Sequence, residues 1–201
     1  MLKIGSLFTG YSGLDMAVER LFDAKTVWVS DIEKGPSRLL AHHYPDTPNL
    51  GDITKINWAD VEPVDIITGG SPCQDVSQAG ARKGMSEGTR SNLWVAMRGA
   101  VSALRPRYVV WENVRGALSA RADSDMGWAE GLLDDRPAER IPTQEKDHAL
   151  RALGRVLGDL ADLGYDASWA TVPASAVGAP HKRERVFVLA WDQDAPHAPG
   201  E

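Results

Sequence analysis

The sequence has little cysteine, few long apolar runs and no surplus of positive charge. Cys73 is the single cysteine among 201 residues, which excludes an internal disulfide and a cysteine-rich zinc site. There is neither a signal-type apolar segment near Met1 nor an apolar stretch of about 18 residues that could span a membrane. We therefore expect a cytoplasmic protein that needs no membrane and no metal.

The charge balance is acidic, with 22 Lys and Arg against 28 Asp and Glu and a net charge of −6. Such a balance argues against nucleic-acid binding if it is spread evenly over the surface. It is concentrated instead, because residues 121–162 hold ten acids and six bases and supply −4 of the −6. The rest of the chain is nearly neutral and leaves room for a local basic surface.

What the sequence does contain is a regular alternation of apolar strands and amphipathic helices. Strands are predicted at residues 3–8, 26–30, 64–68, 108–111, 167–172 and 185–191, and helices at residues 14–21, 36–43, 92–104 and 150–163. This order predicts an α/β fold, a doubly wound and mostly parallel sheet with helices on both faces, formed by residues 1–191. We expect a flexible acidic insertion at residues 121–146 and a disordered polar tail at residues 192–201.

Cys73 follows one of the predicted strands, after the segment Gly69-Gly70-Ser71-Pro72. Free cysteine is among the most buried residue types, so a small core residue and a nucleophile explain this position equally well. The polar segment at residues 74–84 shows neither helical nor strand periodicity. A thiol that is held rigidly at the end of a strand, next to such a loop, is well placed to act as a nucleophile.

Polar clusters also follow other predicted strands, at the edge where ligands bind in such a sheet. The turn Phe8-Thr9-Gly10-Tyr11-Ser12-Gly13 is followed by Asp31 at the next strand end and by Asp52 in a later loop. Carboxylates there can accept hydrogen bonds from ribose hydroxyls or an adenine amino group, or can simply cap helices. Because no lysine follows the turn, an adenosine-containing cofactor without a long phosphate tail is favoured.

Two further clusters carry charge. Glu112 follows four apolar or aromatic residues, and burial there would raise its pKa and let it share a proton with a substrate. The segment His181-Lys182-Arg183-Glu184-Arg185 precedes the last strand, and in an extended chain Arg183 and Arg185 point to the same side. The simpler interpretations are a helix N-cap for Glu112 and a solvated charge run for the basic segment.

Taken together, these segments resemble the signatures of cytosine-C5 DNA methyltransferases, in order and in spacing, between residues 4 and 191. Adenine and N4-cytosine methylases carry an Asn/Asp-Pro-Pro-aromatic tetrapeptide where this chain has Ser71-Pro72-Cys73-Gln74. The resemblance implies a Rossmann-like methyltransferase fold and rests on four segments: Phe8-Thr9-Gly10-Tyr11-Ser12-Gly13, Pro72-Cys73-Gln74, Glu112-Asn113-Val114 and Arg183-Glu184-Arg185.

The resemblance also implies roles for the matched residues. Cys73 would attack C6 of a cytosine flipped out of double-stranded DNA, Glu112 would bind its N3 edge, and Arg183 and Arg185 would hold its O2. C5 would then take a methyl group from S-adenosyl-L-methionine. The residues expected to bind this cofactor are Phe8, Gly10, Tyr11, Gly13, Asp31, Ile32, Asp52, Ile53, Gly70 and Pro72, and those expected to contact DNA are Gln74, Ser77, Arg90 and Asn113.

The chain departs from the family pattern in three ways. Ser12 replaces the second of three glycines in the cofactor turn, and Ser71 stands where the family commonly has Phe. On this resemblance we also expect the chain to lack the family's target-recognition domain and final segment, which would follow Trp191. Two hypotheses follow: an active DNA methyltransferase, either compact or completed by a second polypeptide, or a catalytically incomplete remnant that binds cofactor or DNA without methylating.

Overall fold

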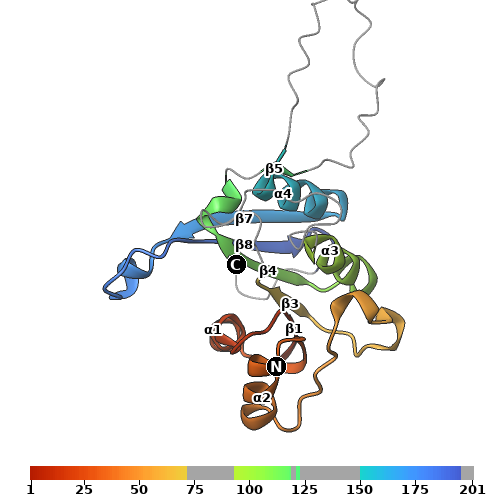
Figure 1. The fold of residues 1–201 in the computed structure, drawn as a ribbon. Coiled ribbons are helices and arrows are strands. Elements are labelled where there is room, and N and C mark those ends of the chain that lie inside the picture. The colour runs from red at the N-terminus through yellow and green to blue at the C-terminus, as the bar shows by residue number, and fades with distance from the viewer. Residues whose placement is uncertain (72–92, 119–120, 123–149, 196–201) are drawn as a thin grey trace, which may run out of the picture.

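The chain folds around one six-stranded sheet (Figure 1). The computed structural model describes residues 1–71, 93–118, 121–122 and 150–195. The strands of this sheet are β1 (Leu2–Leu7), β2 (Ala24–Ser30), β3 (Ile66–Gly69), β4 (Tyr108–Val114), β7 (Tyr165–Val172) and β8 (Arg185–Asp192). The helices are α1 (Gly13–Phe22), α2 (Lys34–His43), α3 (Leu93–Leu104) and α4 (Ala152–Asp162), with short 3-10 turns η1 (Ile53–Lys55), η2 (Trp58–Asp60), η4 (Arg115–Leu118) and η5 (Ala174–Val177).

The sheet has the order β2-β1-β3-β4-β8-β7 and is mostly parallel, as predicted. β1 pairs in parallel with β2 and β3, and β3 pairs in parallel with β4. β8 is antiparallel to both β4 and β7, so it runs opposite to the other strands. The strand order reverses at β1 and β3, which is where a doubly wound sheet opens a crevice at its carboxyl edge.

Helices cover both faces of the sheet, because apolar side chains alternate to both sides of its central strands. On one face, α3 and α4 pack on alternate residues of β4 and β8, and Trp94 meets Trp111 edge-on with 5.9 Å between ring centroids. On the other face, Val18 of α1 packs with Ile4, Ile66 and Val110. Figure 1 shows α1 and α3 on opposite sides of the strands. The predicted doubly wound arrangement is confirmed.

Some boundaries differ from the predicted ones. β1 ends at Leu7, because Phe8 has a left-handed backbone with φ of 54°. β4 continues through Glu112 to Val114, since each of these residues pairs with β8. The predicted fourth helix begins at Ala152 rather than at residue 150, because β6 (Leu150–Arg151) pairs with β5 (Arg121–Ala122).

The predicted insertion and tail lie mostly outside the described residues. Residues 121–122 form β5, whereas residues 123–149 are not among those described. At the other end, β8 continues to Asp192, and the backbone N–H of Gln193 donates to the Gly164 carbonyl at 3.1 Å. The described structure therefore includes the first residues of the expected tail, 192–195. Among the described residues, no helix has the length and apolar character needed to cross a membrane.

Candidate active site

The turn between β1 and α1 is the first part of the site, at the carboxyl edge of the sheet. Phe8, Gly10 and Ser12 all have positive φ, of 54°, 59° and 65°. Such angles reverse the chain tightly at the N-terminus of α1 and are easiest for glycine. The notable member is Ser12, because it stands at the position of a family glycine and does adopt the left-handed conformation.

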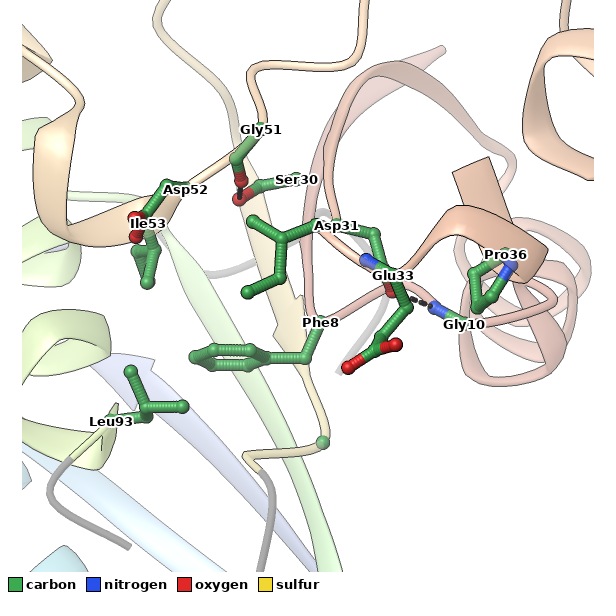
Figure 2. A pocket seen from close by; sticks show the side chains of 12 residues that line it. Phe8, Gly10, Ser30, Asp31, Glu33, Pro36, Gly51, Asp52, Ile53 and Leu93 are labelled. Atoms are coloured by element: carbon green, nitrogen blue, oxygen red, sulfur yellow. Dashed lines mark hydrogen bonds between the residues drawn. The ribbon is translucent and has the colours of Figure 1, made fainter. Parts of the chain in front are cut away.

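A cavity of about 510 Å³ opens beside this turn, between the ends of β1 and β2 (Figure 2). Most of the residues predicted to bind the cofactor line it, with apolar walls and three carboxylates. No lysine or arginine is among the described residues of its lining. Those residues are Phe8, Gly10, Ser30, Asp31, Ile32, Glu33, Pro36, Gly51, Asp52, Ile53, Gly70 and Leu93.

Asp31 fixes the geometry of this cavity. One carboxylate oxygen accepts from the Gly10 backbone N–H at 2.8 Å, as Figure 2 shows, and the other accepts from the Glu33 N–H at 2.8 Å. Asp31 therefore ties the glycine turn of β1 to the loop after β2. Its remaining lone pairs can still accept hydrogen bonds from a ligand.

Asp52 caps a short helix, and its role as a ligand acceptor stays a prediction. It lines the cavity and also caps η1, because its carboxylate accepts from the backbone N–H and the hydroxyl of Thr54 at 3.0 and 2.8 Å. The Thr54 hydroxyl, with the Thr54 N–H and nearby Lys55, holds the pKa of Asp52 below its usual value. The Asp52 carboxylate therefore stays charged.

A second cavity, of about 590 Å³, adjoins the first and holds the charged residues predicted for catalysis. Glu112 lies in it, half-buried within β4. Burial raises the pKa of Glu112 above its usual value, and the guanidinium groups of Arg185 and Arg183 oppose that rise. The direction matches the prediction from sequence, and a carboxyl group with this pKa can hold a proton more readily than an exposed one.

Both predicted arginines line this second cavity with Glu112. Arg185 Nε lies 2.8 Å from Glu112 Oε1. Arg183 is not in extended backbone, because its φ is 22°, so the expected strand-like alternation does not explain its position. Glu184 instead pairs with Arg115 outside the cavity. The interpretation of this segment as a run of solvated charges is therefore wrong for Arg185, which pairs with Glu112 inside the cavity.

Asn113 and Ser71 support the strand end before Cys73. Ser71 is buried, its Oγ accepts from Trp111 Nε1 at 3.0 Å, and its carbonyl accepts from Asn113 Nδ2 at 3.2 Å. The Asn113 carbonyl oxygen accepts from the Val114 N–H at 2.7 Å. The side chain of Asn113 thus holds the chain locally, and contact with DNA stays a prediction.

The two cavities meet at Phe8, Gly10 and Gly70, which line both. A Cβ added at Gly70 would lie 3.1 Å from Glu112 Oε2, so a larger residue would press on that carboxylate. Tyr11 and Gly13, predicted as cofactor residues, line the second cavity together with Glu112. A ligand in the first cavity would therefore lie next to the charged groups of the second.

Several predicted residues lie outside the described part of the chain: Pro72, Cys73, Gln74, Ser77 and Arg90. Sequence reasoning missed Glu33, which lines the first cavity and comes two residues after Asp31. The sequence could have indicated Glu33, since it comes three residues after the end of a predicted strand at the ligand-binding edge. Within the described residues, no group of three His, Cys, Asp or Glu could hold a metal ion.

This structure has a Rossmann-like α/β fold with two adjoining cavities at the carboxyl edge of its sheet, and comparison with known proteins gives the family. The family model for C-5 cytosine-specific DNA methylase matches residues 2–127 and 141–199. The chain belongs to this family.

Curated relatives share about a third of the matched residues. The type II methyltransferase M.NlaIV of Neisseria lactamica is 32% identical over 192 residues, covering 93% of this chain and 40% of the relative. A DNA N-6-adenine-methyltransferase of Escherichia phage P1 is 31% identical, covering 94% of this chain and 28% of the relative. The chain thus spans less than half the length of these two proteins.

Solved structures share the fold. DNMT2 from Spodoptera frugiperda superposes with a TM-score of 0.68 at 20% identity, covering 96% of this chain and 51% of that one. Dnmt2 from S. pombe gives a TM-score of 0.66 at 16% identity, covering 98% and 51%. Here too the matched chain is about twice as long.

Proposed function

We propose that this chain is the catalytic part of a DNA methyltransferase that transfers a methyl group from S-adenosyl-L-methionine to C5 of a cytosine, through a covalent bond to Cys73. The observation that carries the proposal is the junction of two cavities at Phe8, Gly10 and Gly70. One cavity suits an adenosine cofactor, and the other contains Glu112 and two arginines.

The residues of the first cavity fit this cofactor. Phe8, Ile32 and Ile53 provide apolar surface for an adenine ring, and Asp31, Glu33 and Asp52 provide acceptors for ribose hydroxyls and an amino group. The three carboxylates also suit a ligand that carries positive charge, whereas a phosphate would find no lysine or arginine in the described lining. S-adenosylmethionine, when bound, supplies an electrophilic methyl group on a sulfonium centre.

The second cavity can activate a cytosine. Cytosine C5 is a weak nucleophile, so covalent addition must come first: the Cys73 thiolate forms a bond to C6, and the ring electrons move toward N3 and C5. Glu112, whose pKa is raised by burial, holds a proton at N3 during this step. Arg185, paired with Glu112 at 2.8 Å, and Arg183 stabilise negative charge around the base and the thiolate. After C5 has gained its methyl group, loss of the C5 proton returns the electrons and breaks the sulfur–C6 bond.

The target cytosine must be flipped out of the duplex to enter this cavity, and its unstacking and unpairing cost a few kcal/mol. His181, Lys182 and Arg183 are exposed where the chain enters β8, beside the second cavity. They give this edge a basic surface despite the acidic net charge. We place the DNA backbone there, with Gln74, Ser77, Arg90 and Asn113 as further contacts.

The hypothesis that further polypeptide completes this protein is supported by an exposed apolar surface on the sheet. On the α1 face, the β8–β7 half of the sheet presents Phe187, Leu189 and Trp191 with little cover, and Leu189 is 36% exposed. Leu14 and Ala17 of α1 line the second cavity together with Phe187. Parallel sheets are covered on both faces, and an exposed apolar patch on the antiparallel half is a surface that a further segment can cover. We infer that further polypeptide, in the same protein or a second one, covers this face and supplies target recognition.

The test is covalent trapping on duplex DNA that contains 5-fluorocytosine, with S-adenosylmethionine present. The fluorine at C5 cannot leave as a proton does, so an active enzyme stays bonded through Cys73. We expect an adduct, with the protein alone or with the polypeptide encoded by a neighbouring reading frame, and none with Cys73→Ser. If the protein binds cofactor and forms no adduct in either condition, the enzymatic proposal is wrong and the remnant hypothesis stands.

A further inference from the structure

A cluster of buried polar side chains lies directly beneath the cofactor turn. Its members come from β1, the turn, α1 and β3, and each is at most 8% exposed: Ser6, Thr9, Ser12, Asp15 and Thr68. Buried polar groups cost stability unless they are hydrogen-bonded, so a cluster of five in this position needs an explanation.

The carboxylate of Asp15 is the centre of the cluster. One oxygen accepts from Ser12 Oγ at 2.8 Å, and the other accepts from Thr68 Oγ1. Burial raises the pKa of Asp15, and hydrogen bonds from the Thr68, Ser12 and Ser6 hydroxyls oppose the rise. The carboxylate thus joins the turn to β3, two residues before Gly70, where the two cavities meet.

Ser12 is the strained member. It precedes α1 in the left-handed region, with φ of 65° and ψ of 23°, where residues with a Cβ are disfavoured. Its hydroxyl does not cap the helix and donates to Asp15 instead. The Ser12 N–H donates to the Thr9 carbonyl at 2.8 Å, so the same residue also closes the turn.

We propose that Asp15 is a positioning residue for the cofactor turn: its hydrogen bond holds Ser12 in the left-handed conformation that a glycine would adopt unaided. The inference rests on the proposed cofactor site. It explains how the chain tolerates a serine at a glycine position. The Cβ of Ser12 makes the left-handed conformation unfavourable, but the Ser12 hydroxyl donates to Asp15, and this hydrogen bond stabilises the conformation. Asp15 would not itself contact the cofactor.

The test is a double-mutant cycle on cofactor affinity, with S-adenosylhomocysteine as the probe and isothermal titration calorimetry as the measurement. Asp15→Asn should weaken binding about tenfold, because a hydrogen bond to a charged group contributes at least that much. Ser12→Gly alone should bind within about twofold of wild type, since glycine needs no support at this φ. In the Ser12→Gly background, Asp15→Asn should then cost less than about threefold.

A purely structural role for Asp15 predicts instead that the tenfold loss persists in the glycine background, and that result would overturn the inference. Asp159→Asn is the matched control, because Asp159 is a buried carboxylate that pairs with Arg155 at 2.7 Å within α4 and accepts from Trp94 Nε1 of α3 at 2.7 Å, away from the turn. It should lower the free energy of unfolding and leave the affinity unchanged.

A second pair of variants covers the case in which Asp15→Asn does not fold. Ser12→Ala keeps the strain of a Cβ and removes the hydroxyl, so it should bind about tenfold more weakly than Ser12→Gly. Equal affinities for these two variants would contradict the inference. If the wild-type protein binds no S-adenosylhomocysteine, the proposed cofactor site itself is wrong. If it binds and the cycle is additive, only the role of Asp15 is wrong.

Discussion

Ser71 offers a direct test of how the strand end before Cys73 is held. Trp111 is fully buried, and its indole N–H donates to Ser71 Oγ at 3.0 Å. Ser71→Ala removes that acceptor and almost no volume. It leaves a donor in the core without its partner, for which the cost is about 1–3 kcal/mol. That is a large share of a typical stability of about 5–15 kcal/mol.

The assay is equilibrium unfolding in urea, made in two backgrounds. Trp111→Phe removes the indole donor, so Ser71→Ala should then cost less than about 0.5 kcal/mol, and the difference gives the coupling energy of the pair. The reasoning would be refuted if Ser71→Ala cost the same in both backgrounds. Because Ser71 leads directly into Pro72 and Cys73, the same substitution should also slow covalent trapping on 5-fluorocytosine DNA.

Two other predictions concern the carboxylates of the site. Asp31→Asn should weaken S-adenosylhomocysteine binding about tenfold by calorimetry, because the amide replaces one of the two oxygens that hold the Gly10 and Glu33 N–H groups; an unchanged affinity would contradict the role given to Asp31. Glu112 has a raised pKa in the folded state, so its contribution to stability is present at low pH and lost as pH rises through that pKa. Glu112→Gln should therefore gain stability relative to wild type as the pH rises through the pKa of Glu112 in urea titrations, and a relative loss over the same rise in pH would show that the pairing with Arg185 outweighs burial.

The local pattern of apolar residues was sufficient to locate the main strands and helices. Apolar periodicity placed every main strand and helix within a few residues, because each element buries one face or both in a sheet of this class. It could not place the end of β4, since Glu112 and Asn113 are polar and their strand pairing depends on β8. It also could not find β5 and β6, whose two-residue pairing depends on contacts between distant parts of the chain.

For the site, the sequence predicted Asp31 at a strand end and Asp52 in a loop, without showing how their oxygens are used. Both turned out to bind backbone N–H groups as well as to line the cavity. The alternatives of structural cap and ligand acceptor were therefore not exclusive, because one carboxylate has room for both. The family resemblance gave no reason for a serine at position 71. The structure gives one, because Ser71 Oγ accepts a hydrogen bond from the indole N–H of Trp111 on the neighbouring strand β4.

The direction of β8 brings the charged residues of the second cavity together. Arg183 and Arg185 lie just before a strand or at its start, whereas Glu112 lies near the end of one. In a fully parallel sheet these positions would lie at opposite edges. Because β8 is antiparallel to β4, Val114 pairs with Arg185 and Glu112 pairs with Phe187, and the guanidinium group reaches the carboxylate at 2.8 Å. The reversal of one strand thus brings the cations to the carboxyl edge where the first cavity opens, and it follows from long-range pairing that no local sequence pattern encodes.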